Sequence, residues 1–163
     1  MVTAKIWWCI QTTSWEVERT DCVVCTPDNL TVLTYRRTVG EVKRDDIVVH
    51  YRLSNVIAFS RALEDARYYK QLPLVHGVDY QSGWRFETEY FDLQTPLHRT
   101  CFAKHLSNLR KRHFPIDRKG NLRQGYFFYF DHEGLKFILD QLSEPLPVWL
   151  ESIRNIGPKA RGD

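Results

Sequence analysis

Ile47-Val-Val-His-Tyr51 and Val56-Ile-Ala-Phe-Ser-Arg-Ala62 are two runs of strand-forming residues, separated by the short turn Leu53-Ser-Asn55. β-Branched and aromatic residues favour the half-buried surface of a sheet, and a turn of this length joins neighbouring antiparallel strands. The sequence therefore predicts a β-hairpin over residues 47–62, and the remaining elements are assigned relative to it.

Further short strands are predicted on both sides of this hairpin. Lys5–Gln11 is an apolar run with two adjacent tryptophans, and Val23–Cys25 is a second short run. Trp84–Phe91 alternates apolar with charged residues, which is typical of a half-buried antiparallel strand. Gln124–Phe130 is predicted as the last strand.

The connections between these strands are expected to be short or irregular. Residues 12–20 carry Trp15 and are interpreted as a surface connection or a single helical turn. Residues 27–44 mix proline, asparagine and glycine with basic residues, and are interpreted as an irregular loop.

Two helices and a shorter third one are predicted outside the strands. Apolar residues recur at helical spacing over residues 99–112, and Asp131 is placed to cap a helix whose buried stripe runs from Leu135 to Leu142. A short helix is expected around Trp149. About six strands, two or three flanking helices and no repeated β-α-β alternation predict an α+β domain built as a small β-barrel.

The length of 163 residues predicts one domain over residues 1–143, followed by a short C-terminal helix and linker over 144–163. No apolar run is long enough to cross a bilayer, and the N-terminus lacks the pattern of a signal sequence. Four scattered cysteines favour a reducing compartment, so we expect a soluble, cytoplasmic protein without a membrane partner. Cys22-Val-Val-Cys25 has metal-ligand spacing but no second pair, so no metal or cofactor is predicted.

Basic residues are concentrated in one segment of the chain. The overall charge is +3, yet the stretch from Arg99 to Arg123 holds eight basic residues and the single acid Asp117, a local charge of +7. Such a segment is either a solvated helix face or a surface that binds a polyanion.

Motifs of catalysis are missing from the sequence. The six histidines show no metal-binding spacing, and no nucleophile motif of the GxSxG, HExxH or Walker type accompanies them. The paired acids Asp45-Asp46 and Glu64-Asp65 are interpreted as solvated strand ends. We therefore predict a non-catalytic binding domain.

Aromatic residues make up 13% of the chain, and two of them, Trp7 and Trp8, are adjacent on one strand. Their side chains must point to opposite faces, so one fills the barrel interior. The other either lines a groove or packs beneath an outer helix. Together with the basic segment, the aromatics suit a base reader, in which Lys and Arg hold phosphates and a base lies against aromatic rings. Gln11, Ser60 or Asn55 could read the base edge.

The ordered motifs resemble those of a known family. Val42-Lys-Arg-Asp-Asp-Ile-Val-Val-His-Tyr51 and the strand after it resemble the hairpin of EVE domains, which are similar to YTH domains of the PUA-like superfold. Ile6-Trp-Trp-Cys-Ile-Gln11 is similar to the start of the version fused to McrB-type GTPases and other modification-dependent restriction nucleases. The other matching stretches are Trp84–Tyr90, Pro96-Leu97 and Arg123–Tyr126, and the match spans about residues 5–142.

The resemblance implies a PUA-like barrel that binds DNA or RNA and swings one base into an aromatic cage. The base is commonly 5-methylcytosine or N6-methyladenine. It implies a specificity module for double-stranded DNA with a modified base, whose nuclease or GTPase effector lies in another domain or subunit. The rival hypotheses are an RNA-modification reader, a protein-interaction module with an aromatic groove and, least favoured, a base-modifying enzyme.

Positions carried over from the family, together with the polar candidates above, give the expected site. Val24 stands where the family often has a tryptophan, so one cage wall is either missing or supplied by another residue such as Trp15 or Tyr69. The segment Tyr68–Tyr80 is expected to be mobile and to close over the base. The base pocket is expected to comprise Trp8, Gln11, Trp15, Val24, Tyr51, Ser60, Tyr69 and Tyr80. The nucleic-acid backbone is expected to contact Arg52, Lys104, Arg110, Lys111, Arg112, Arg118, Lys119 and Arg123.

Overall fold

The predicted hairpin lies in the middle of a mixed sheet. Strand β3 (Ile47–Arg52) pairs antiparallel with β4 (Asn55–Ala62) through the turn at Leu53 and Ser54. This confirms the antiparallel hairpin expected from the two strand-forming runs. The structure, a computed structural model, describes residues 3–27, 34–72, 81–109, 111 and 114–155.

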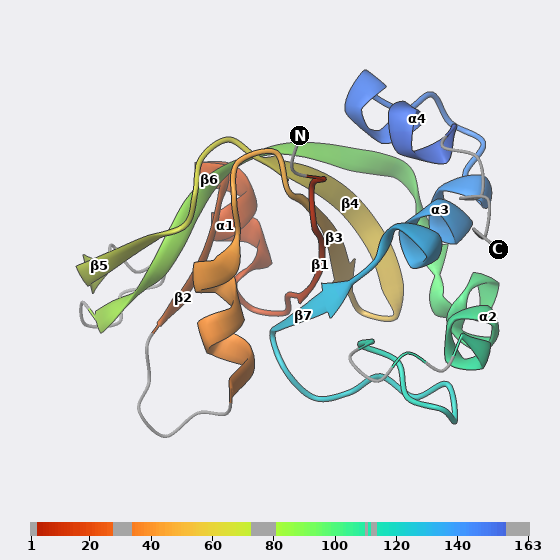
Figure 1. The fold of residues 1–163 in the computed structure, drawn as a ribbon, viewed down its shortest axis with the longest axis horizontal. Coiled ribbons are helices and arrows are strands. Elements are labelled where there is room, and N and C mark those ends of the chain that lie inside the picture. Colours follow the sequence, from red (N-terminus) through yellow and green to blue (C-terminus); the bar gives the residue numbers. More distant parts are fainter. Residues whose placement is uncertain (1–2, 28–33, 73–80, 110, 112–113, 156–163) are drawn as a thin grey trace, which may run out of the picture.

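Seven strands form one strongly curled sheet (Figure 1). Their order is β2-β6-β4-β3-β1-β7, and β5 also pairs with β6. β1 runs parallel to β3, and the other pairs are antiparallel. Within the described residues no ladder joins β2 to β7, so the sheet is a half-barrel. The remaining strands are β1 (Ile6–Ile10), β2 (Val23–Pro27), β5 (Arg67–Leu72), β6 (Gln81–His98) and β7 (Phe127–Phe130).

Helices lie on both faces of the sheet. Figure 1 shows α2, α3 and α4 gathered on one side, and α1 and η1 on the other. Among the described residues, no helix is long and apolar enough to cross a membrane. The helices are α1 (Trp15–Asp21), α2 (Ala103–Asn108), α3 (His132–Asp140) and α4 (Val148–Arg154), with the 3-10 segments η1 (Thr34–Glu41) and η2 (Arg99–Cys101).

The two adjacent tryptophans face opposite sides of the sheet, as their spacing predicts. Trp8 packs against Phe102 and Phe130 beneath α2 and α3, on what we call the outer face. Trp7 lies on the inner face, where it stacks on Phe127 and its Nε1 donates to Asp46 Oδ2 at 2.9 Å. Both tryptophans are fully buried. The inner face is concave, because side chains from distant strands of the sheet meet there.

The observed helices refine the sequence predictions. The Asp131 side chain accepts a hydrogen bond from Gly134 N at 2.8 Å, which confirms the predicted cap of α3. The helix expected over 99–112 is shorter, because η2 precedes α2 and the α-helical hydrogen bonds end at Asn108. α4 packs on α3 and buries Leu150 in the same core.

Several strands and loops differ from their predicted bounds. β6 extends far beyond 84–91, because its first half pairs with β2 and β5 and its second half with β4. The last strand covers 127–130 rather than 124–130. The loop expected over 27–44 contains the 3-10 segment η1, and the start of the segment expected to be mobile, 68–72, belongs to β5.

Gly83 marks the point where β2 and β5 pair with β6. A Cβ on Gly83 would lie 2.2 Å from Thr26 O and 2.4 Å from Leu72 Cδ1. We expect Gly83→Ala to lower the free energy of unfolding by about 3 kcal/mol, the upper part of the range for overpacking. Chemical denaturation of the native protein and of Gly83→Ala measures this difference in unfolding free energy.

The matched control is Gly120→Ala, where nothing lies within 4 Å of the added Cβ but φ is +81°. Only the backbone conformation is penalised there, so the expected loss is about 1 kcal/mol. Equal losses at the two glycines would contradict the close packing of the three strands.

Candidate functional site

A group of polar side chains is fully buried on the inner face of the sheet. Gln11 follows β1, Glu18 belongs to α1, His50 to β3 and Ser60 to β4, and each has a relative exposure of 0%. Strand alternation explains the grouping, since Gln11 continues the inner series of Trp7 along the first strand. Buried polar groups are stable only when hydrogen-bonded, and this group is.

The four side chains form one continuous chain of hydrogen bonds. Ser60 Oγ lies 2.7 Å from His50 Nε2, and His50 Nδ1 lies 2.6 Å from Gln11 Oε1. Gln11 Nε2 donates to Glu18 Oε2 at 2.6 Å. Because an amide oxygen only accepts, Nδ1 of His50 carries the proton and Nε2 accepts from the serine hydroxyl.

The Glu18 carboxylate accepts four hydrogen bonds. Gln11 Nε2 and Ser14 Oγ donate to Oε2, while Cys25 N and the Tyr126 hydroxyl donate to Oε1. Burial raises the pKa of Glu18, and the hydrogen bonds oppose that rise. Since Cys25 lies on β2 and Tyr126 directly precedes β7, this carboxylate links two strands between which the described residues form no ladder.

The imidazole of His50 is held neutral. Burial, assisted by the positive charge of Arg19, lowers the pKa of His50 from its ordinary 6.5 to about 3. The ring therefore keeps one donor and one acceptor at neutral pH, and the chain from Ser60 to Glu18 has a fixed direction of donation.

Two half-buried aromatic rings lie over this polar chain. Trp15 meets Tyr90 edge-on, with ring centroids 5.6 Å apart and planes at 83°, and both rings contact the imidazole of His50. Arg19 lies 5.1 Å from the Tyr90 ring centroid and forms a bidentate ion pair with Asp92. We call the buried polar side chains the polar floor, and the rings of Trp15 and Tyr90 the aromatic rim. The rim covers the floor at the start of α1.

The structure brings together part of the predicted pocket. Gln11 and Ser60 belong to the polar floor, Trp15 forms the rim, and Val24 packs in the inner core. Asn55, the third candidate for reading a base edge, instead donates from Nδ2 to Leu53 O in the hairpin turn.

The placement of Trp8 and Tyr51 as pocket walls is corrected. Their rings pack together on the outer face, with centroids 5.4 Å apart, so the sheet separates them from Gln11. Of the two alternatives for the second tryptophan, packing beneath the outer helices is observed. Tyr69 lies on β5 opposite Gly83, and Tyr80 lies outside the described residues.

Sequence reasoning missed four members of the site, namely Glu18, His50, Tyr90 and Tyr126. One signal was present in the sequence. His50 follows two valines and precedes a tyrosine on a strand predicted to be buried, and a buried histidine requires a polar partner. The partners come from distant segments, however, and only the fold brings them together.

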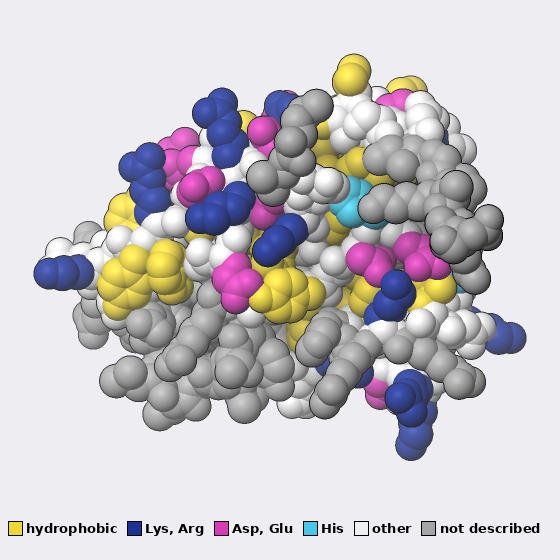
Figure 2. Space-filling view, viewed as in Figure 1, with side chains coloured by type: hydrophobic (Ala, Val, Ile, Leu, Met, Phe, Trp, Pro, Cys, Tyr) yellow, Lys and Arg dark blue, Asp and Glu magenta, His cyan; other side chains and the backbone are white. Residues whose placement is uncertain are grey.

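The predicted phosphate-binding residues have different surroundings. Lys104, Arg118, Lys119 and Arg123 are exposed, and Arg52 is partly buried. Lys111 is ion-paired with Asp131 at 3.2 Å and Glu133 at 3.4 Å, so its charge is largely neutralised locally. Arg110 and Arg112 lie outside the described residues. On the face shown in Figure 2, Lys and Arg side chains stand among Asp and Glu side chains.

Two arginines follow or precede residues that lie where the ends of β1 and β3 meet the segment before β7. Gln11 N donates to Tyr51 O and Ile10 N donates to Tyr126 O, so the ends of β1 and β3 meet the segment that enters β7. Arg52 directly follows Tyr51, and Arg123 lies three residues before Tyr126. Two arginines thus lie close in sequence to residues at this edge of the sheet.

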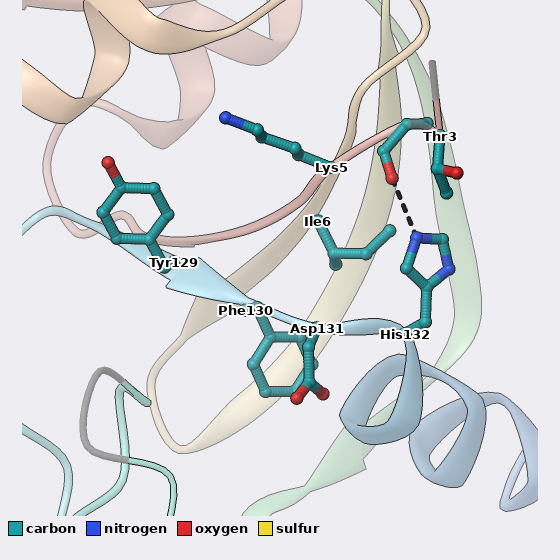
Figure 3. A pocket seen from close by; sticks show the side chains of 8 residues that line it. Thr3, Lys5, Ile6, Tyr129, Phe130, Asp131 and His132 are labelled. Atoms are coloured by element: carbon teal, nitrogen blue, oxygen red, sulfur yellow. Dashed lines mark hydrogen bonds between the residues drawn. The ribbon is translucent and has the colours of Figure 1, made fainter. Parts of the chain in front are cut away.

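A hollow of about 300 Å³ lies elsewhere, between the first strand and the start of α3 (Figure 3). Ile6, Tyr129 and Phe130 line it, and His132 Nε2 contacts Ala4 O at 2.8 Å. It contains none of the polar chain described above. Across the described part of the chain, no three His, Cys, Asp or Glu side chains are grouped to hold a metal ion.

Comparisons with known proteins bear on the architecture. No family model and no curated protein matches the sequence. One similar solved structure is the NMR structure of Rpa0253 from Rhodopseudomonas palustris, a Northeast structural genomics consortium target. It shares 11% identity with a TM-score of 0.53, over 84% of this chain and 92% of that chain. At this identity, the likeness shows the fold alone.

The neutral His50 makes stability depend on pH. Because its pKa is lower in the folded state, the unfolded chain binds more protons below pH 6.5, and stability falls as the pH drops towards 3. We expect unfolding free energy to fall more steeply between pH 6.5 and 4 in the native protein than in His50→Gln, by roughly 1 kcal/mol per pH unit.

Denaturant titrations across that pH range test this difference. Glu18 has the opposite effect, because its raised pKa makes the unfolding free energy fall as the pH rises through the folded-state pKa. The native protein and His50→Gln both contain Glu18, so its contribution does not enter their difference. His105→Gln, at an exposed position, is the matched control for replacing a histidine by glutamine, and because it removes a ring stacked on Phe137, only the slopes with pH are compared. Parallel curves for the native protein and His50→Gln would contradict a buried neutral imidazole.

Proposed function

We propose that the chain is a nucleic-acid reader of the EVE/YTH-like type, with a PUA-like barrel, which takes a flipped, modified base of DNA into the site beneath Trp15. The observation that carries the proposal is the aromatic rim over a directed chain of polar groups, Gln11, His50 and Ser60. The curled half-barrel and the order of the sequence motifs support it.

The chemistry of the site suits a planar, polar ligand. A base inserted between Trp15 and Tyr90 separates rings that now touch, and it stacks on them at about 1–3 kcal/mol per base. Beneath it, the neutral imidazole and the oriented amide are already hydrogen-bonded within the polar chain, so a base edge must replace some of these hydrogen bonds. A base edge that matches these donors and acceptors satisfies the groups it displaces, and a mismatched edge leaves a buried group unpaired.

The energies require phosphate contacts as well. Flipping a base costs a few kcal/mol, and a methyl group in an apolar pocket adds only about 1–3 kcal/mol of discrimination. Stacking alone therefore leaves little net affinity. The electrostatic part of the affinity comes from basic residues that contact phosphates, namely Arg52, Arg123 and the exposed Lys104, Arg118 and Lys119.

The domain acts as the specificity module of a modification-dependent restriction system, whose nuclease or GTPase lies in another domain or subunit.

Trp15 is the residue through which the proposal is tested. Fluorescence anisotropy measures binding to duplexes that differ only in one central base: cytosine, 5-methylcytosine, adenine or N6-methyladenine. We expect Trp15→Ala to weaken binding of the preferred duplex by roughly 5- to 150-fold, the loss of one stacked base. Unmodified duplex should be affected much less.

The matched control is Trp149→Ala, which removes another half-buried tryptophan on α4. It should leave the preference unchanged while circular dichroism reports a native fold for both variants. If the native protein binds all duplexes equally, the proposal that it recognises a modified base is overturned. Tighter binding of single-stranded RNA with the same modification favours the RNA reader, and altered bases after incubation reveal an enzyme.

Salt dependence separates the two kinds of basic residue. Each phosphate contact contributes about 0.9 to the slope of log affinity against log salt on B-DNA. We expect Arg123→Ala to reduce that slope by about this amount, because Arg123 is exposed and lies three residues before Tyr126, whose hydroxyl contacts Glu18. Lys111→Ala should change it little, because Lys111 is already paired with two acids. A slope near zero for the native protein would indicate a protein-interaction module.

A further inference from the structure

The turn of the β3–β4 hairpin has an unfavourable backbone for its residues. Leu53 and Ser54 lie between the paired residues Arg52 and Asn55 and have φ values of 48° and 68°. Two consecutive residues of positive φ define a type I′ turn, for which Asn-Gly is strongly preferred. Leucine is among the least suitable residues for this conformation, so folding does not explain its presence.

Leu53 is also apolar and exposed. Its relative exposure is 74%, among the highest of the large hydrophobic residues in the described part of the chain. The backbone around it is held firmly, because Asn55 Nδ2 donates to Leu53 O at 2.8 Å and Arg99 N donates to Ser54 O at 2.9 Å. A strained conformation that its surroundings hold in place is typical of functional sites.

The turn lies at the same end of the sheet as the proposed base site. Tyr51 O accepts the hydrogen bond of Gln11 N, and Leu53 follows two residues later. In Figure 1 the hairpin turn, the end of β1 and the start of β7 all lie in the lower middle of the view.

Basic groups flank the exposed leucine. Arg52 precedes it and is partly buried, and its Nε is a buried atom without a hydrogen-bond partner within the described residues. Arg99, which contacts the turn through its backbone, donates from Nη2 to Gly120 O at 2.8 Å. It thereby holds the segment with the exposed Arg118 and Lys119 against this end of the sheet.

We propose that Leu53 is a wedge that enters the DNA duplex and fills the space left by the flipped base, an inference that rests on the proposed function. Apolar side chains inserted between base steps unstack them, and phosphate contacts on both sides hold the backbone in place. A leucine on a rigid two-residue turn reaches into the stack with little loss of backbone freedom on binding, because the turn backbone is already held. The neighbouring arginines carry the flanking phosphates.

The test compares two duplexes that carry the same preferred modified base. In the first the modified base is paired, and in the second it faces an abasic site, so that no base pair has to be broken. Leu53→Asn removes the wedge and suits positive φ, so its unfolding midpoint should rise. We expect it to bind the paired duplex about tenfold more weakly than the native protein does and the abasic duplex within twofold.

Two further variants complete the design. Leu53→Phe keeps an apolar wedge and should bind the paired duplex within about twofold of the native protein. Leu63→Asn changes another exposed leucine, at the opposite end of β4, and should bind both duplexes normally.

The outcomes separate the wedge from the proposed function. If the native protein prefers the modified base and Leu53→Asn binds both duplexes normally, the wedge is overturned and the reader stands. An equal loss on both duplexes also overturns it, because Leu53 is then a general contact. If the native protein shows no preference for the modified base, the reader fails and the wedge with it.

Discussion

The carboxylate of Glu18 joins the two sides of a barrel that backbone pairing leaves open. It accepts hydrogen bonds from Cys25 N on β2 and from the Tyr126 hydroxyl just before β7. A buried carboxylate is costly to desolvate, and only a full set of donors offsets that cost. The position of α1, the closure of the inner face and the orientation of the Gln11 amide all depend on this group.

The two faces of the sheet differ in chemical character. Its outer face carries a large apolar core beneath α2, α3 and α4, and Trp8 belongs to it. The inner face combines a smaller apolar cluster around Trp7 with the polar chain and its aromatic rim. Neighbouring residues along β1 point to opposite faces, which explains why Trp7 and Trp8 are both buried and yet belong to different cores.

Local patterns predicted the elements whose causes are local. The hairpin at 47–62, the first strand and the Asp131 cap depend on neighbouring residues, and all three are present. The length of β6 was not predictable, because its strand character depends on three different partners.

The site was only partly predictable for the same reason. Gln11, Trp15 and Ser60 were recognised as polar or aromatic candidates, but Glu18 and Tyr126, 108 residues apart, acquire their role through contact with each other. Trp8 was misplaced because alternation assigns it a face without saying what covers that face. The covering helices are formed by residues beyond position 100.

The parallel pairing of β1 with β3 also has a consequence for how the chain folds. β1 lies between β3 and β7, whose residues come about 40 and 120 positions later. Contacts this distant in sequence form slowly, because long loops must close first. During synthesis, the first strand therefore emerges long before either neighbour, with both tryptophans unshielded. A nascent chain with this topology is therefore prone to aggregate through its exposed first strand until β3 and β7 have been synthesised.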